Sequence, residues 1–140
     1  MTFSIAARCR KTGMFGVAIS SSSPAVAARC AHARAGAGAI CSQNVTDPRL
    51  GTRGLNLLAE GATAEETLEI LVNTGSHIEY RQVTVVDRLS GSAIHTYSRT
   101  TRRSSGKALL GSGTWCRLRI SVATSTDRSS SGRRCAVPSS

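Results

Sequence analysis

The second residue of the chain is a threonine, a residue type that acts as a nucleophile when it stands at an N-terminus. Removal of Met1 would place the Thr2 hydroxyl beside a free α-amine, whose pKa of about 7.7–8.0 lies close to working pH. Such a pair can attack an amide carbonyl, with the amine serving as the base. Threonine also follows methionine in many proteins that have no enzymatic activity, so both interpretations of Thr2 stay open.

Polar side chains suited to binding a substrate occur in two further places. Ser20 and Ser21 begin a run of four serines before a proline, and their hydroxyls could line a pocket or belong to a solvated loop. Gln43, Asn44 and Asp47 lie where a strand is predicted to lead into a helix, a place suited to orienting substrate or supplying an oxyanion donor. In the structural alternative, Asp47 caps the helix and Asn44 shapes the turn.

Arg53 is the last candidate, because its guanidinium could clamp a substrate carboxylate or form an ion pair on a helix surface. The three histidines, His32, His77 and His95, have no spacing typical of a metal site. The glycines form neither the G-x-G-x-x-G pattern nor a P-loop. We therefore predict no metal site, no nucleotide site and no cofactor.

Alternating apolar and polar residues predict the strands that must position these side chains. The clearest are Thr2–Arg8 and Met14–Ser20, which form a hairpin around a polar turn, and the pair Tyr80–Asp87 and Ser92–Tyr97. Two shorter extended segments are expected at Pro24–Ala33 and Gly38–Gln43, although their many alanines are also compatible with helix.

Two helices are predicted between these strands. Thr46 or Asp47 caps the first, which has Pro48 in its first turn and ends at Gly61. Thr63 opens the second with a capping box. Strands followed by two helices and more strands indicate an α+β fold with a mainly antiparallel sheet and helices lying on it.

The chain of 140 residues is the size of one domain, and its positive charge of +10 is unevenly distributed. Residues 1–97 hold nine Arg and Lys against seven Asp and Glu, whereas residues 98–140 hold nine against one. A neutral body with a basic, Ser-rich and Arg-rich end indicates a tail without regular structure. We expect no specific nucleic-acid partner, because the body lacks a basic surface and the tail has a single aromatic residue.

The five cysteines have no C-x-x-C spacing, which favours buried free thiols in a reducing compartment and a cytoplasmic location. No run of eighteen apolar residues predicts a transmembrane helix, so no membrane association is expected.

Several stretches of the body together resemble the bacterial domain-of-unknown-function family 1028, whose members look like N-terminal-nucleophile (Ntn) hydrolases. The resemblance is carried in chain order by MTFSIAAR (1–8), TGMFGVA (12–18), RAGAGAI (34–40), QNVTDP (43–48), GTRGL (51–55), RQV (81–83) and VD (86–87). It covers residues 1–97.

The resemblance implies an Ntn-type fold, with two stacked sheets and outer helices. It also implies an amidohydrolase that uses Thr2 on a small amide or peptide-like substrate. The alternative is a non-catalytic binding or assembly protein on the same fold.

Family members continue with more sheet and helix, so residues 1–97 are expected to form an incomplete sandwich with an exposed face. We expect an inactive or aggregation-prone chain unless a partner chain, as in a homo-oligomer, covers that face. For residues 98–140, we interpret the composition as out-of-frame translation of a GC-rich gene beginning near 95–98; the alternative is a genuine basic extension.

Overall fold

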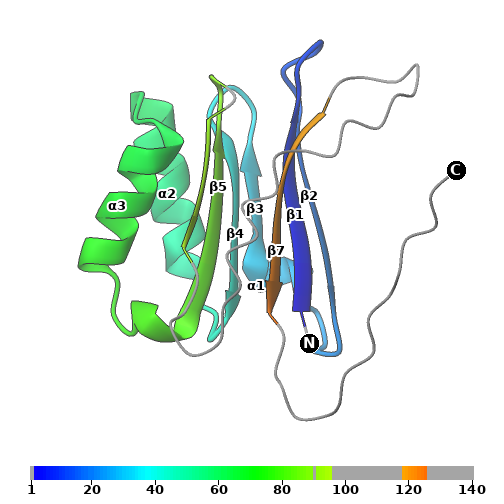
Figure 1. Ribbon diagram of the computed structural model, residues 1–140, viewed down its shortest axis with the longest axis vertical. Helices are drawn as coiled ribbons and strands as arrows, with labels where there is room; N and C mark the ends of the chain where they lie inside the picture. The colour runs from blue at the N-terminus through cyan, green and yellow to red at the C-terminus, as the bar shows by residue number, and fades with distance from the viewer. Residues whose placement is uncertain (1, 90, 96–117, 126–140) are drawn as a thin grey trace, which may run out of the picture.

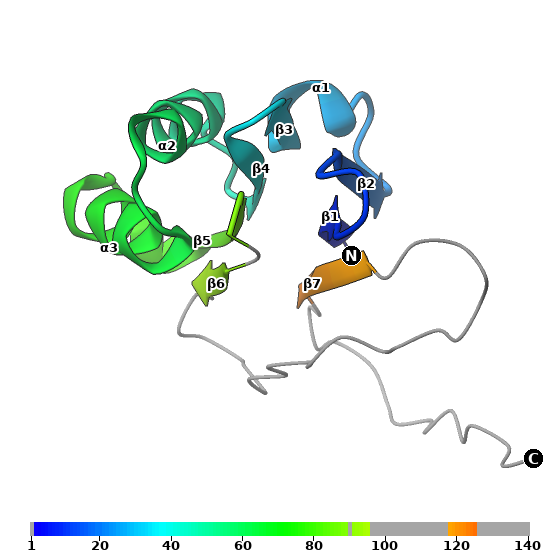
Figure 2. The same ribbon diagram turned by 90° about the horizontal axis from the view of Figure 1, so that it is seen from above.

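The computed structural model describes residues 2–89, 91–95 and 118–125, and in these residues two β-sheets lie face to face (Figure 1). Two helices cover the outer face of one sheet, and no described helix covers the outer face of the other (Figure 2). The predicted α+β class, with stacked antiparallel sheets and outer helices, is confirmed.

The first sheet has the order β2-β1-β7, with β1 at its centre. Both neighbours run antiparallel to β1, so that Thr2 pairs with Ser21 on one side and with Ser125 on the other. The predicted N-terminal hairpin is confirmed by β1 and β2. The strands span Thr2–Cys9 (β1), Phe15–Ser21 (β2) and Leu118–Ser125 (β7).

The second sheet is fully antiparallel and has the order β3-β4-β5-β6. Its two central strands are β4 and β5, and they are buried along almost their entire length. The turn between β3 and β4 contains Gly36, whose positive φ of 74° suits a residue without a side chain. The strands span Ala31–Arg34 (β3), Gly38–Asn44 (β4), Arg81–Asp87 (β5) and Ser92–His95 (β6).

The two long helices begin and end where their capping residues predict. Asp47 caps the first by accepting a 3.1 Å hydrogen bond from the Arg49 backbone N–H, and Gly61 ends it in the left-handed conformation. Thr63 and Glu66 form the predicted capping box of the second. The helices span Ala27–Cys30 (α1), Pro48–Glu60 (α2) and Ala64–Thr74 (α3), with a short 3₁₀ helix η1 at Ile78–Tyr80.

The main core lies between these two helices and the second sheet. It contains the inward stripe of α2 and α3 and the side chains of β4 and β5 that face them: Ile40, Leu50, Leu55, Leu58, Leu71, Val83 and Val85. The chain has few aromatic residues, so its core is aliphatic. Removing these aliphatic side chains from water is the main stabilisation of the fold.

A second, smaller apolar cluster lies between the two sheets. Its buried members are Ala6, Ala39, Cys41 and Val86, and the half-buried Phe15 and Val17 of β2 pack against them. Most of these residues are small, which lets the two sheets approach each other closely.

The segment 24–33 differs from the extended conformation that the sequence predicted. Ala27–Cys30 form one helical turn, and only then does β3 begin. The physical reason is the high helix propensity of alanine, which was the alternative for this stretch. Arg29 also folds back across the turn, donating hydrogen bonds to the Ser23 hydroxyl and the Pro24 carbonyl.

The prediction of a structureless tail over residues 98–140 does not hold for Leu118–Ser125. This segment is β7, and it pairs with the whole length of β1. Leu118, Ile120 and Val122 alternate with other residues, a period-two pattern that is typical of strands and that the surrounding Ser and Arg obscured. The same prediction covers residues 98–117 and 126–140, which lie outside the described residues.

We predict that Gly38→Ala lowers the free energy of unfolding by about 1–3 kcal/mol, the usual cost of overpacking. A methyl group on Gly38 would meet the backbone carbonyl of Val86, on the neighbouring strand, which cannot turn aside like a side chain. The control is Gly16→Ala on β2, where a methyl group meets no atom within 4 Å. Urea unfolding should show little loss or a small gain for this control; equal destabilisation by both variants would contradict the prediction.

Candidate functional site

The candidate site lies at the end of the sandwich where β1 begins. Thr2 is half-buried there, and its hydroxyl lies 2.9 Å from the hydroxyl of Ser21, its cross-strand neighbour on β2. The Ser21 hydroxyl also accepts a hydrogen bond of 3.2 Å from the backbone N–H of Ser23. The strand register therefore holds Thr2 beside Ser21, the second residue of the serine run.

Polar side chains fill the gap between the sheets on the Thr2 side of the small apolar cluster. Because side chains alternate along a strand, Ser4 shares the inward face of β1 with Thr2. Gln43 and Gln82 face each other on the paired strands β4 and β5, and the Gln43 amide group donates a hydrogen bond of 2.5 Å to the Gln82 side-chain carbonyl. We call Ser4, Gln43, Gln82 and Thr84 the polar layer; each is at least 97% buried.

The polar layer includes a buried hydroxyl that no described residue satisfies. The Thr84 hydroxyl has no hydrogen-bond partner among the residues that the structure describes. A buried hydroxyl without a partner costs free energy, which makes Thr84 a candidate for contact with water or a ligand group.

Cys41 lies on the same side of β4 as Gln43 and belongs to this interior. Burial raises the pKa of the Cys41 thiol to about 11, and the neighbouring Ser4 hydroxyl acts in the opposite direction. A thiol that stays protonated at neutral pH is a poor nucleophile. Cys41 is therefore a poor candidate for a nucleophile at neutral pH.

Asn44 and Asp47, both predicted to bind substrate, make contacts within the protein. Asn44 has a positive φ of 76°, and its side-chain amide donates a hydrogen bond of 2.7 Å to the Tyr80 carbonyl. Both carboxylate oxygens of Asp47 are occupied: Arg49 donates to each, and Arg81 lies 3.0 Å from one. These contacts are those of the structural alternative, in which the two residues shape the turn and cap the helix.

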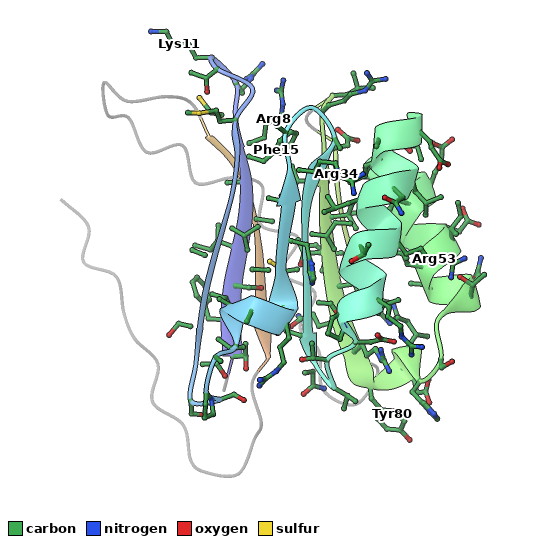
Figure 3. All side chains as sticks on the ribbon, turned by 180° about the vertical axis from the view of Figure 1, so that it is seen from behind. Arg8, Lys11, Phe15, Arg34, Arg53 and Tyr80 are labelled. Carbon is green, nitrogen blue, oxygen red and sulfur yellow. The ribbon has the colours of Figure 1, made fainter. Side chains whose placement is uncertain are left out.

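The other two predicted residues point elsewhere. Ser20 is exposed on β2 and pairs with Phe3, on the face of the sheet away from the gap. Arg53 is exposed on α2, on the far side of the second sheet from Thr2 (Figure 3). The structure thus brings Thr2 and Ser21 together, places Gln43 on the side of β4 that faces the gap, and directs Ser20 and Arg53 away from it.

Sequence reasoning missed most of the polar layer. Ser4 is two residues after Thr2 in an alternating strand, and that spacing was the signal that could have identified it. Gln82 and Thr84 alternate with Val83 and Val85, which looks like a strand with one face in water. Both faces of β5 are in fact buried, because the first sheet covers the face that carries the polar side chains.

Three other features of the described residues bear on function: groups that could bind a metal, helices that could cross a membrane, and the cysteines. Within residues 2–89, 91–95 and 118–125, no group of three His, Cys, Asp or Glu is arranged to hold a metal ion. No helix in the same part of the chain is long and apolar enough to cross a membrane. Cys30 and Cys41 are the free, buried thiols that we predicted, but Cys9 differs, because it is disulfide-bonded.

Comparison with known proteins identifies a family, and a solved structure of that family is similar to this chain. The sequence pattern of the family of unknown function DUF1028 matches residues 2–114. A crystal structure of a DUF1028 protein from Silicibacter pomeroyi matches with a TM-score of 0.67 and 27% sequence identity. That match covers 85% of this chain and 52% of the other, so this chain spans about half the length of its solved relative. No curated protein matches the chain.

The family match extends past residue 97, where the sequence analysis placed the end of the resemblance. The match does not support a boundary near that residue, and the out-of-frame interpretation of residues 98–140 stays a prediction.

We predict that stability depends on the charge of Asp47. Hydrogen bonds from the Arg49 side chain, followed by those from the Arg49 backbone and Arg81, hold the pKa of this carboxyl well below its ordinary range, against the effect of desolvation. The Arg49 side chain is 86% exposed and that of Arg81 only 8%, so the contact with Arg81 carries more of the stabilisation. Asp47→Asn keeps a capping side chain but removes the charge. It should lower the free energy of unfolding by about 1–3 kcal/mol at pH 7.

The difference between wild type and Asp47→Asn should be complete at neutral pH and shrink as the pH falls below about 3.9, the pKa of a free Asp. A carboxyl whose pKa is lowered by folding stabilises the folded state only while it is ionised. Glu60→Gln, an exposed change of the same charge on α2, serves as the control in chemical denaturation at several pH values. A difference that does not change with pH would contradict the assignment.

Proposed function

The chain belongs to the DUF1028 family, and on that premise we propose that it is an amidohydrolase of the Ntn type with Thr2 as its nucleophile. The observation that carries this proposal is the position of the Thr2 hydroxyl. It lies at the first residue of a central strand, held 2.9 Å from the Ser21 hydroxyl, at the end of a polar layer between two stacked sheets.

The chemistry requires that Met1 be removed, which exposes the α-amine of Thr2. That amine takes the proton from the Thr2 hydroxyl as the oxygen attacks the carbonyl carbon of an amide. The same proton then passes to the leaving amine as the C–N bond breaks, and an ester remains on Thr2. Water, deprotonated by the amine, hydrolyses the ester and restores the hydroxyl.

The remaining residues of the site take supporting roles in this proposal. Ser21 orients the Thr2 hydroxyl through their hydrogen bond. Gln43 and the Thr84 hydroxyl offer polar groups to a small amide or peptide-like substrate entering between the sheets. Asp47 and Asn44 act at a distance from substrate, by fixing the connection from β4 to α2.

The alternative function is that of a non-catalytic relative that binds or assembles on the same fold. The chain spans about half of its solved relative, so reactivity of Thr2 distinguishes the two functions more directly than turnover of a substrate does. One experiment measures whether Met1 is removed, and the other measures whether Thr2 then reacts.

We predict that the mature chain begins at Thr2. Methionine before a small residue such as threonine would be removed, and the mechanism requires the free amine that this leaves. Intact mass measurement of the protein as expressed should show the loss of one methionine and no added acetyl group. Retained Met1, or an acetylated N-terminus, would rule out Thr2 as nucleophile and favour the non-catalytic alternative.

We further predict that a β-lactone, whose strained ring mimics an activated acyl group, forms an ester on Thr2. The adduct should map to the N-terminal peptide by mass spectrometry and be released by hydroxylamine, which cleaves esters but not amides. Thr2→Ser should retain the ester, and Thr2→Val, which keeps the branched shape but lacks the hydroxyl, should lose it. The rate should rise with pH through about 7.7–8.0, where the α-amine becomes neutral and able to accept a proton.

The matched control is Thr52→Val, which removes an exposed threonine hydroxyl from α2 and should leave labelling unchanged. A hydroxylamine-sensitive adduct that persists in Thr2→Val would place the reactive group elsewhere and contradict the proposal.

A further inference from the structure

The positive charge of the described residues is concentrated in the first third of the chain. Residues 2–46 contain four arginines and one lysine but no aspartate or glutamate, and the first acid of the sequence is Asp47. One of these cations, Arg29, lies near the Thr2 end of the sandwich and is held by hydrogen bonds to Ser23 and Pro24. The other four, Arg8, Arg10, Lys11 and Arg34, belong to two adjacent hairpins at the opposite end.

These two hairpins enclose a groove at that end of the sandwich. One wall is the β1–β2 turn with Met14 and Phe15, and the other is the β3–β4 turn with Arg34 and Gly36. The cavity between them has a volume of about 360 Å³. Figure 3 shows Arg8, Phe15 and Arg34 at this end, with Lys11 at the tip of the first hairpin. We call this feature the hairpin groove.

Arg8 is held at the groove by its neighbours on the hairpin. It pairs with Phe15 across the two strands, and its guanidinium carbon lies 5.9 Å from the centre of the Phe15 ring, at cation–π distance. Gly13, in the turn, has a positive φ of 74°, and an added methyl group there would lie 3.6 Å from the Arg8 guanidinium. The sequence Arg8-x₄-Gly13-x-Phe15 therefore places a cation beside an aromatic surface.

Among the described residues, the charge of Arg34 faces no acid across the groove. Arg34 is exposed and forms no ion pair with any residue in the described part of the chain. Asp87 ends β5 at the same edge of the sandwich. Its carboxylate, however, accepts hydrogen bonds from the backbone N–H groups of Ala64, Leu89 and Gly91, on the helix side of the second sheet.

We propose that the hairpin groove binds a small organic anion that carries a carboxylate or phosphate group on an apolar body. Arginine is the side chain best suited to such groups, because its planar guanidinium can donate two parallel hydrogen bonds to them. The Phe15 ring and Met14, which is 67% exposed, offer apolar surface to the rest of the ligand. A volume of this size fits a small molecule rather than a macromolecule.

This site is distinct from the one at Thr2. The two lie at opposite ends of β1, whose seven steps from Thr2 to Cys9 span about 23 Å. A ligand in the hairpin groove therefore cannot touch the Thr2 hydroxyl, and the proposal stands whether or not Thr2 is a nucleophile.

The test uses phenyl phosphate, with phenol as the neutral comparison, titrated into the full 140-residue chain labelled with ¹⁵N. Phenyl phosphate should shift the backbone amide signals of Thr12, Gly13 and Gly36, and phenol should not. Arg34→Gln should raise the dissociation constant at least about tenfold, the effect of one lost charge-assisted contact. The matched control, Arg53→Gln, removes the same charge from an exposed position on α2 and should change the constant less than twofold.

Arg34 and Arg53 are both exposed, so both variants should keep the amide spectrum of the folded protein. Binding should also weaken as salt is added, because the contacts are ionic. Shifts confined to the two turns and lost in Arg34→Gln support the proposal. No shift at millimolar phenyl phosphate, or equal weakening by Arg34→Gln and Arg53→Gln, would overturn it, since the second result indicates general attraction to a basic protein.

Discussion

The inward face of β1 determines what the gap between the two sheets contains. Because side chains alternate along this strand, Thr2, Ser4, Ala6 and Arg8 share one face. That face is polar at Thr2 and Ser4, apolar at Ala6 and positively charged at Arg8. A slip of one residue in the register would instead turn Phe3, Ile5 and Ala7 into the gap. The pairing of β1 with both β2 and β7 fixes that register from two sides.

Burying a polar layer between two sheets costs free energy unless its polar groups form hydrogen bonds. The Gln43 amide group donates a hydrogen bond to the Gln82 side-chain carbonyl, because their strands pair the two residues directly. The Thr84 hydroxyl is left without a partner in the described part of the chain, which an interior selected only for stability would avoid. The small apolar cluster next to the layer packs the two sheets against each other.

Much of the fold could be predicted from the sequence, because its signals are local. The caps at Asp47, Gly61 and Thr63 define both long helices, and the alternation of residues 2–20 defines the first hairpin. The site could be predicted only in part, since the position of Gln82 beside Gln43 depends on a strand pair almost forty residues apart. Nothing local indicates that the polar face of β5 is covered by another sheet, or that Leu118–Ser125 pairs with β1.

The polar layer and the site at Thr2 both depend on which side chains of β1 point between the sheets. Nuclear Overhauser effects on the labelled 140-residue chain measure this without any assumption about reactivity. Cross-peaks are expected from Ser4 to Cys41 and from Thr2 to Ser21, and Phe3 should give none to β4. Cross-peaks from Phe3 or Ile5 to Cys41 or Gln43 would show that the opposite face of β1 is buried, and would contradict both the polar layer and the site at Thr2.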